Sequence, residues 1–361
     1  MPRVIGIDPG TLTVDICGLD NGSVFLDRSL PTAQALADPS IILGMLENAQ
    51  PLDLIAGPSG YGLPLVEAQR LTETDIRLAC LAAAGETGGI GGLGSLMRAL
   101  ARSSLPIVFT PGVVHLASVP AHRKVNRVDM GTADKVCAAA LAVREQARRR
   151  GCAEREVSFL LLEMGGAFTA AIAVVNGRIV DGAGGTSGPL GARAAGALDG
   201  EVAFLAGQVH KSLLFTGGAS TIAGDPEAPA GSIAAPATAR GRVAWEAYIE
   251  STVKAVMSLA VSAPGACEII ISGRFAGIAG VRDELTRRFA AVSAPPLRTL
   301  EGFASVAGQA AQGAALIADG LAGGTSAALV DALGIREASG TVLDHLYVIT
   351  PAAARARLGI A

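Results

Sequence analysis

Aromatic and charged residues are both scarce in this chain of 361 residues, at 4% and 17%, and the formal net charge is −3. The shortage of aromatic rings argues against a surface that binds nucleic acid by stacking on its bases. The nearly balanced charge gives no electrostatic reason to expect attraction to DNA, RNA or an anionic membrane. We therefore expect neither nucleic acid nor a membrane as a partner.

Cysteine is sparse as well, and the five cysteines form no Cys-x-x-Cys pair. An odd, scattered set predicts neither a disulfide framework nor a zinc site, and a reducing cytoplasm is the expected location. The first residues lack the basic and apolar segments of a signal peptide. The most apolar windows, such as 159–175, are interrupted by Glu163 and a glycine pair, so we expect no membrane-spanning helix.

Several common catalytic motifs are missing. No Gly-x-x-x-x-Gly-Lys-Ser/Thr sequence is present, which excludes a P-loop ATPase, and the four histidines do not have metalloprotease spacing. No Gly-x-Ser-x-Gly sequence marks a hydrolase nucleophile. Residues 89–94 fit Gly-x-Gly-x-x-Gly, but a helix is predicted before them and no acidic residue follows about 20 positions later. We expect a mobile loop at a cleft mouth there rather than a dinucleotide site.

A long internal repeat is the main positive feature. The stretches VIGIDPGTLTVDICGLDNG and LLLEMGGAFTAAIAVVNG match without a gap at a constant offset of 155 residues, which places Asp8 on Glu163 and Gly10 on Gly165. Each copy predicts three strands, with an Asn-Gly pair between the second and third. Asn-Gly favours a type I′ hairpin turn, because both central residues need a positive φ. The predicted strands are 4–8, 12–20, 23–30, 158–164, 168–177 and 178–185.

The remaining pattern alternates helices and strands, as expected for an α/β protein of two domains of roughly 150 residues. Helices are predicted at 33–49, 65–85, 132–150, 245–262, 281–292 and 305–321. Further strands are predicted at 53–57, 105–110 and 268–272, and a surface loop at 224–241. The helix 132–150 ends in three arginines, which suit the negative end of a helix dipole better than a nucleic-acid surface.

The first repeated turn, DPGTLT, has the residue types that a nucleoside triphosphate and its magnesium ion require. Gly10 could present backbone N–H groups at close range, and Thr11 and Thr13 could present hydroxyls. Asp8 could bind a magnesium ion or its water. An ordinary glycine turn in a hairpin is the alternative for this motif alone, and the ungapped repetition favours phosphate binding.

The second turn, EMGGAFT, offers a matching set. Gly165, Gly166 and Thr169 could surround the other side of the phosphates, and Glu163 could act as a second magnesium carboxylate. Thr186 and Ser187, further along, could begin a helix whose N-terminus binds an anion. Capping of that helix without a ligand is the alternative.

Two such hairpin units joined by a helix resemble the superfamily of acetate kinases, sugar kinases, heat-shock ATPases and actin. More narrowly, 111–135 and 184–205 resemble the predicted butyrate kinase family of archaea and bacteria. The resemblance implies an α/β fold of two actin-like, ribonuclease H-like lobes, each a mixed five-stranded sheet with flanking helices, around a central cleft. The lobes would span 1–131 and 132–361, with the connecting helices in the second lobe and a C-terminal helix that could pack back on the first. A homodimer is expected by analogy.

The resemblance also assigns further site residues. Gly273 and Arg274 match the strand end that passes beside the adenosine, although a second glycine is usual where Arg274 stands. Arg274 could stack on adenine, contact a phosphate, or be a solvated arginine. Asp129 matches a carboxylate that positions or deprotonates the acceptor, but Asp129 or Thr132 could instead cap the helix that follows.

The basic residues just before Asp129 have two interpretations as well. His122, Arg123 and Arg127, together with Lys124, could bind a carboxylate or phosphate, or could be solvated charges on a loop. Together these features predict a Mg-ATP-dependent kinase for a small carboxylate or hydroxyl acceptor. Asp15 stands where acetate and butyrate kinases carry a basic residue, which weakens the carboxylate version. A nucleotide-driven switch or scaffold and a phosphoanhydride hydrolase are the alternatives.

Overall fold

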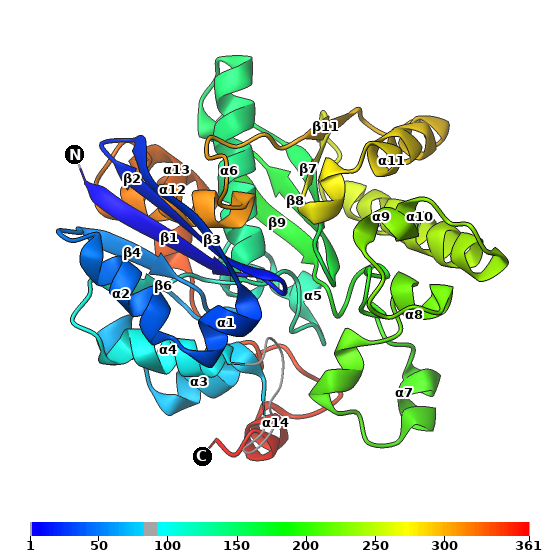
Figure 1. The fold of residues 1–361 in the computed structure, drawn as a ribbon, viewed down its shortest axis with the longest axis horizontal. Helices are drawn as coiled ribbons and strands as arrows, with labels where there is room; N and C mark the ends of the chain where they lie inside the picture. The colour runs from blue at the N-terminus through cyan, green and yellow to red at the C-terminus, as the bar shows by residue number, and fades with distance from the viewer. Residues whose placement is uncertain (1, 83–91, 361) are drawn as a thin grey trace.

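The computed structural model describes residues 2–82 and 92–360, which form two β-sheets with helices between and around them (Figure 1). Residues 89–91 of the Gly-x-Gly-x-x-Gly stretch lie outside the described residues. The first sheet has the strand order β3-β2-β1-β4-β6-β5 and the second has the order β11-β10-β7-β8-β9. Both sheets are mixed, with one antiparallel three-stranded unit followed by parallel neighbours, and the last strand of the first sheet, β5, is antiparallel to β6.

The first sheet contains six strands rather than the five predicted, because a two-residue edge strand, β5, joins it. Its strands are β1 (Arg3–Pro9), β2 (Thr13–Asp20), β3 (Ser23–Pro31), β4 (Leu54–Gly57), β5 (Val66–Glu67) and β6 (Ile107–Phe109). The second sheet has five strands, namely β7 (Phe159–Met164), β8 (Thr169–Val175), β9 (Arg178–Ala183), β10 (Ile269–Ser272) and β11 (Leu297–Thr299).

The two repeats fold into the same backbone. Asn21 and Asn176 both have φ of 52°, and the glycine after each has a positive φ of 79° or 71°, so both pairs form the predicted hairpin turn. The register of each hairpin shifts at the corresponding point, between Gly18 and Leu19 in one copy and between Ala173 and Val174 in the other. The local sequence therefore encodes the turns and the strand irregularity alike.

Helices cover both outer faces of the sheets and fill the layer between them. They are α1 (Thr32–Ala37), α2 (Ser40–Asn48), α3 (Glu73–Cys80), α4 (Leu93–Arg102), α5 (Ala121–Lys124), α6 (Ala133–Arg150), α7 (Gly200–Ala206), α8 (Ala219–Ala223), α9 (Ala230–Ala234), α10 (Ala239–Ala260), α11 (Ala279–Ala291), α12 (Gln309–Leu321), α13 (Ala327–Leu333) and α14 (Pro351–Arg357).

Two helix predictions and one loop prediction need correction. The predicted helix 33–49 is divided into α1 and α2 at Pro39, which has no N–H for a helical hydrogen bond and disfavours helix at the preceding residue. The segment 65–85 begins with β5 and a short 3-10 turn, and α3 starts only where Thr72 and Asp75 form a capping box. The predicted loop 224–241 contains α9 and the first residues of α10.

The central layer consists mainly of α6 and α12, which stand between the two sheets (Figure 1). Successive side chains of β1 and β7 point alternately into this layer and into the outer core on the opposite face of the sheet. Helix α12 packs directly on β1, where a Cβ on Gly6 would lie 2.2 Å from the backbone nitrogen of Ala315. Only glycine permits this approach, which brings the N-terminus of α12 beside the ends of the β-strands.

The chain ends near the first sheet. The guanidinium of Arg77, in α3, donates a hydrogen bond of 3.0 Å to the carbonyl of Leu358, just after α14. The C-terminal segment therefore lies against the N-terminal half of the molecule. Among the described helices, none combines the length and the apolar character needed to cross a lipid bilayer.

Candidate functional site

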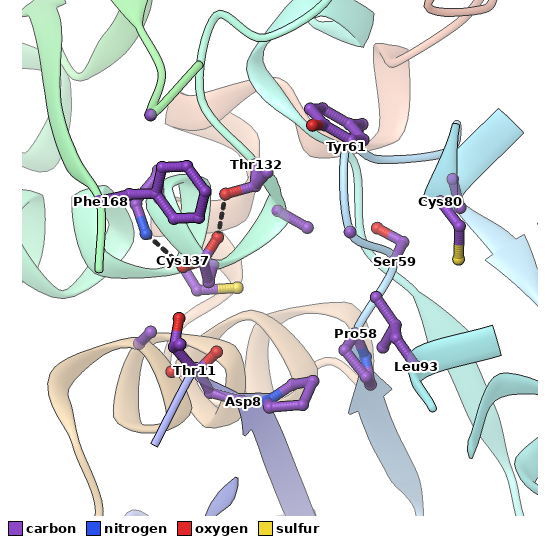
Figure 2. Close-up of a pocket in the computed structure, with 18 of the residues that line it drawn as sticks. Asp8, Thr11, Pro58, Ser59, Tyr61, Cys80, Leu93, Thr132, Cys137 and Phe168 are labelled. Carbon is purple, nitrogen blue, oxygen red and sulfur yellow. Dashed lines mark hydrogen bonds and ion pairs between the residues drawn. The ribbon is translucent and has the colours of Figure 1, made fainter. Parts of the chain in front are cut away.

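The C-terminal ends of β1 and β7 open into a cleft with two connected chambers. We call the first the glycine chamber. It has a volume of about 300 Å³ and is bordered by both repeated turns, the end of β10 and the N-terminus of α12. The second, the apolar chamber, has a volume of about 140 Å³ and lies deeper among β4, α3 and the segment before α6 (Figure 2). Asp8, Thr11, Asp134, Lys135 and Ala310 line both chambers and mark where they meet.

Asp8 and Glu163, the equivalent carboxylates of the two repeats, lie at the ends of β1 and β7. Burial, together with the nearby carboxylate of Asp134, raises the pKa of Asp8 well above its usual value. The same two causes raise the pKa of Glu163, with partial compensation from Lys135. Close, half-buried carboxylates repel one another, and a cation between them would relieve that repulsion.

Lys135 provides the resident positive charge of this cluster. Its Nζ atom lies 2.5 Å from a carboxylate oxygen of Asp134 and 3.0 Å from one of Glu163. Burial alone would lower the pKa of Lys135, but the two carboxylates raise it above its usual value. Burial alone would raise the pKa of Asp134, yet the ammonium group holds it below its usual range. Lys135 and Asp134 are therefore both charged at neutral pH.

Most of the predicted phosphate-binding residues do border the glycine chamber. They are Thr11, Thr13, Gly165, Gly166, Gly273 and Arg274. Gly273 has a φ of 85°, and a Cβ there would lie 2.5 Å from the carbonyl oxygen of Met164, so only glycine fits at this strand end. The side chain of Arg274 is exposed at the chamber wall.

Two predicted phosphate ligands are placed elsewhere. Thr169 is fully buried, and its hydroxyl donates a hydrogen bond of 3.4 Å to the hydroxyl of Tyr248 in α10. Because side chains alternate along β8, Thr169 faces the outer core, and the preceding Phe168 points into the apolar chamber. Gly10 shapes the first turn without lining either chamber, and its carbonyl accepts a hydrogen bond of 2.7 Å from Thr32.

Asp129 lies in the wall of the apolar chamber, with 3% of its surface exposed. Its Oδ2 atom accepts hydrogen bonds of 2.8 Å from both the backbone N–H and the hydroxyl of Thr186. A Cβ on Gly184 would lie 1.7 Å from Oδ1, so a glycine is needed there for Asp129 to adopt this position. Asp129 does not cap α6, and Thr132, at the cap position, makes no side-chain capping bond.

Thr186 and Ser187 are not followed by a helix, contrary to the prediction. The next helix in the described part of the chain is α7, which begins at Gly200 and is capped by Asp199. Thr186 instead binds the Asp129 carboxylate, and the Ser187 hydroxyl donates to the Asp129 backbone carbonyl. The two residues hold Asp129 in place rather than capping a helix, and of the two only Thr186 lines a chamber.

The basic residues predicted to bind the acceptor line neither chamber. Arg127 contacts the Asp181 carboxylate of β9 at 3.3 Å, and Arg123 donates to the Val180 carbonyl at 2.8 Å. His122 is exposed at the surface, on α5. Asp181 is buried and attracts the guanidinium groups, so these side chains are directed toward β9 and away from the cleft.

Sequence reasoning assigned no role to Lys135, Asp134, Ser59 or Tyr61. The sequence did contain a signal for Asp134 and Lys135. A lysine in the first turn of a helix opposes the helix dipole, and these two charges precede a long apolar run. Ser59 and Tyr61 follow β4, at the same sheet edge as Asp8, and line the apolar chamber (Figure 2). Nothing in their local sequence indicates that position.

The residues present fit a magnesium ion that is held largely by phosphate and water. Among residues 2–82 and 92–360, no three or more His, Cys, Asp or Glu side chains form a metal site. Magnesium commonly takes only one or two protein carboxylates when a bound phosphate completes its coordination. Asp8 and Glu163 would supply oxygen ligands of that kind, and burial, with a smaller contribution from nearby carboxylates, raises the pKa of both.

Comparison with known proteins places the chain in a family. Residues 6–348 match the family described as "Protein of unknown function (DUF1464)", and the chain belongs to that family. No curated protein matches the sequence.

Solved structures show the fold class. A propionate kinase from Francisella tularensis subsp. tularensis SCHU S4 is similar over 87% of this chain and 98% of its own, with 11% identity and a TM-score of 0.62. Acetate kinase from Entamoeba histolytica covers 80% of this chain and 87% of its own, at 12% identity and a TM-score of 0.58. Acetate kinase from Porphyromonas gingivalis covers 81% and 88%, at 14% identity and a TM-score of 0.57. The chain therefore has the fold of the acetate and propionate kinases, as predicted.

Proposed function

We propose that this protein is a Mg-ATP-dependent phosphotransferase that transfers the terminal phosphoryl group to a small acceptor. The observation that carries the proposal is the pair of chambers joined at Asp8, Thr11 and Lys135. The glycine chamber has the two repeated turns on opposite sides, which suits a triphosphate. The apolar chamber begins where the terminal phosphate would end and contains Asp129, so a donor and an acceptor can meet at the junction.

The roles of the residues follow from their places. Thr11 and Thr13 offer hydroxyls to the phosphates, and Gly165 and Gly166 allow close approach of the opposite turn. Arg274 can contact the nucleotide at the chamber wall. Lys135 lies at the junction, where negative charge accumulates as the phosphoryl group is transferred. Asp8 and Glu163 would hold the magnesium ion, which supplies charge neutralisation to the phosphate oxygens when bound.

Exclusion of water matters for such a site, because hydrolysis competes with transfer. Phe168 and Phe215 contact each other at the apolar chamber with ring centroids 4.8 Å apart, and Leu93 lines the same chamber. Phe168 follows directly from the second repeated turn and therefore links the phosphate-binding backbone to the acceptor chamber (Figure 2).

The test is magnesium-dependent ADP release by the wild-type protein, with and without a panel of short acids and alcohols. Acceptor-dependent release supports the proposal. Phosphate release regardless of acceptor would instead indicate a phosphoanhydride hydrolase, and nucleotide binding without turnover a switch or scaffold. Asp8→Ala should abolish turnover and leave the far-ultraviolet circular dichroism spectrum unchanged. Asp331→Ala, an exposed carboxylate on α13, is the matched control with unchanged turnover.

A further inference from the structure

We infer that the acceptor is a small molecule that presents a hydroxyl group and carries no carboxylate or other anionic group. This inference rests on the proposed function and specifies its substrate class. It differs from what the similar acetate and propionate kinases act on according to their names. Two independent properties of the apolar chamber carry it, namely the charges that line it and the direction of its hydrogen bonds.

The charged side chains that line the apolar chamber are three carboxylates and one ammonium group. The carboxylates belong to Asp8, Asp129 and Asp134, and the ammonium group to Lys135. Lys135 is already bound by Asp134 and by Glu163. The described lining residues include no arginine or histidine, and the sequence of residues 83–91 contains no basic residue. Carboxylates thus outnumber cations among the described lining residues, and an anionic acceptor would find no arginine or histidine partner among them.

The hydroxyl groups of the chamber also favour an acceptor that donates a hydrogen bond. Ser59 donates its hydroxyl hydrogen to the carbonyl of Thr110, and Thr110 donates to the carbonyl of Gly57 at 3.4 Å. Thr132 donates to Asp134, and Thr186 to Asp129. These four hydroxyls therefore have their hydrogens engaged, while Thr11 and Tyr61, which also line the chamber, carry two further hydroxyls. A carboxylate can only accept hydrogen bonds and would find those four donors already engaged, whereas an alcohol can donate to them.

Asp129 completes the acceptor site. Thr186 donates two hydrogen bonds to its Oδ2 atom, and Gly131 N–H lies 3.3 Å from Oδ1. Oδ1 packs against Gly184 and accepts fewer hydrogen bonds than Oδ2, so it is the oxygen that would receive a proton. In the transfer, the acceptor oxygen forms a bond to the terminal phosphorus while the bond from that phosphorus to the bridging oxygen breaks. The electron pair leaves with ADP, and the hydroxyl proton passes to the Asp129 carboxylate.

One further cation lies near the chamber without lining it. The Nζ atom of Lys211 is 4.6 Å from the centre of the Tyr61 ring and 3.4 Å from its hydroxyl oxygen. Tyr61 lines the chamber and is hydrogen-bonded to Thr186. If an anionic acceptor were used, Lys211 would be a candidate residue to contact it. The experiment therefore includes Lys211→Met.

The experiment compares alcohols with carboxylates of equal length, namely 1-propanol with propionate and 1-butanol with butyrate, at equal concentrations with Mg-ATP. ADP release is measured together with alkyl phosphate by phosphorus NMR and acyl phosphate by trapping with hydroxylamine. We expect the alcohols to raise ADP release at least tenfold above the rate with water alone and to yield alkyl phosphate. We expect the carboxylates to change that rate by less than twofold.

Trapped hydroxamate, or stimulation by the carboxylates, would overturn the inference and leave the phosphotransferase proposal standing. Loss of that stimulation in Lys211→Met would then identify the residue that binds the anion. Magnesium-dependent nucleotide binding with no response to either series also counts against the inference. Absence of magnesium-dependent nucleotide binding in calorimetry would instead contradict the proposed function itself.

Asp129→Asn separates positioning of the acceptor from binding of the nucleotide. We expect it to lower alcohol-dependent turnover by about 10²–10⁴-fold, the usual contribution of a general base, with the KM for ATP within twofold of wild type. Asp319→Asn is the matched control, because Asp319 is also buried and also accepts bonds from a backbone N–H and a hydroxyl, at Ser326 and Thr325. Equal losses in both variants would show that Asp129 has only a structural role.

Discussion

The two repeated turns have the same backbone and different side chains. Both place a carboxylate at the end of the first strand, both close with an Asn-Gly hairpin, and both shift register at the corresponding point. The first turn carries hydroxyl groups, at Thr11 and Thr13. The second has Gly166 and Phe168 at the equivalent positions.

The difference between the two turns gives the candidate site a polar side and an apolar side. The first turn offers polar groups to the glycine chamber, and Thr11 reaches the apolar chamber as well. The second turn leaves space at Gly166 and directs the ring of Phe168 into the apolar chamber. The carboxylates differ too, since Glu163 is paired with Lys135 at 3.0 Å, whereas Asp8 has no ion pair among the described residues. The same backbone therefore presents different chemistry to the cleft through a few side chains.

The largest expected effect tests whether the Asp8 and Glu163 carboxylates contribute unequally to magnesium binding. We expect Asp8→Asn to lower magnesium-dependent ADP release by at least about 10³-fold, because an unpaired carboxylate is the available magnesium ligand. Glu163→Gln should lower it by about 10–100-fold, since Lys135 already neutralises this position. Steady-state kinetics at several magnesium concentrations measures both. Equal losses would show that the two repeats contribute equivalently to the metal site.

Lys135 is ion-paired with Glu163 of the second repeat and lines both chambers. Its removal should have the next largest effect. Lys135→Met should lower kcat by about 10²-fold, because it removes a positive charge from the place where the phosphoryl group is transferred. It should also destabilise the protein by about 3 kcal/mol, since two half-buried carboxylates lose their partner. Lys135→Arg retains the charge and should recover most of the stability in thermal unfolding. Lys254→Met, in an exposed ion pair with Glu250, is the control and should change neither quantity.

Substitution of Gly166 would fill the space that the second repeated turn leaves in the glycine chamber. A Cβ on Gly166 would lie 2.9 Å from Cδ1 and 3.2 Å from Cγ of Leu12, a side chain that can shift, and 4.0 Å from Nε of Arg274, so Gly166→Ala should fold. The added methyl group occupies the glycine chamber, and we expect the KM for ATP to rise about tenfold. Gly280→Ala, in α11 with open space around it, is the matched control and should leave the KM unchanged. An unchanged KM in Gly166→Ala would place the phosphates elsewhere.

The smallest expected effect concerns the pH dependence of stability. An acid whose pKa is raised by folding stabilises the native state fully below its ordinary pKa, and this contribution is lost as pH rises through the raised value. The ligand-free protein should therefore lose stability above about pH 4 on account of Asp8. Asp8→Asn should flatten that decline and raise the melting temperature at pH 8 by about 1–2 °C for each kcal/mol relieved. A lower melting temperature in the variant would contradict the repulsion inferred here.

The sequence predicted the two hairpin units because their determinants are local. Alternation of apolar residues, the Asn-Gly pairs and a carboxylate before each glycine turn all lie within about 20 residues of one another. Strand geometry then places Asp8 and Glu163 at strand ends without any knowledge of the tertiary fold. Thr169 was expected beside the phosphates but faces the outer core. Side chains alternate along β8, so only one of the neighbours Phe168 and Thr169 can face the cleft. The irregular turn between β7 and β8 hides which is which.

The sequence by itself thus determined two three-stranded hairpin units, the connecting helices and the class of fold. Only the tertiary structure decided which distant side chains meet. Asp129 binds Thr186, 57 positions away, and Arg127 is directed to Asp181, 54 positions away, rather than to the cleft. The physical reason is that hairpins depend on hydrogen bonds between near neighbours. The partners of a buried carboxylate depend instead on how two sheets and the helices between them pack.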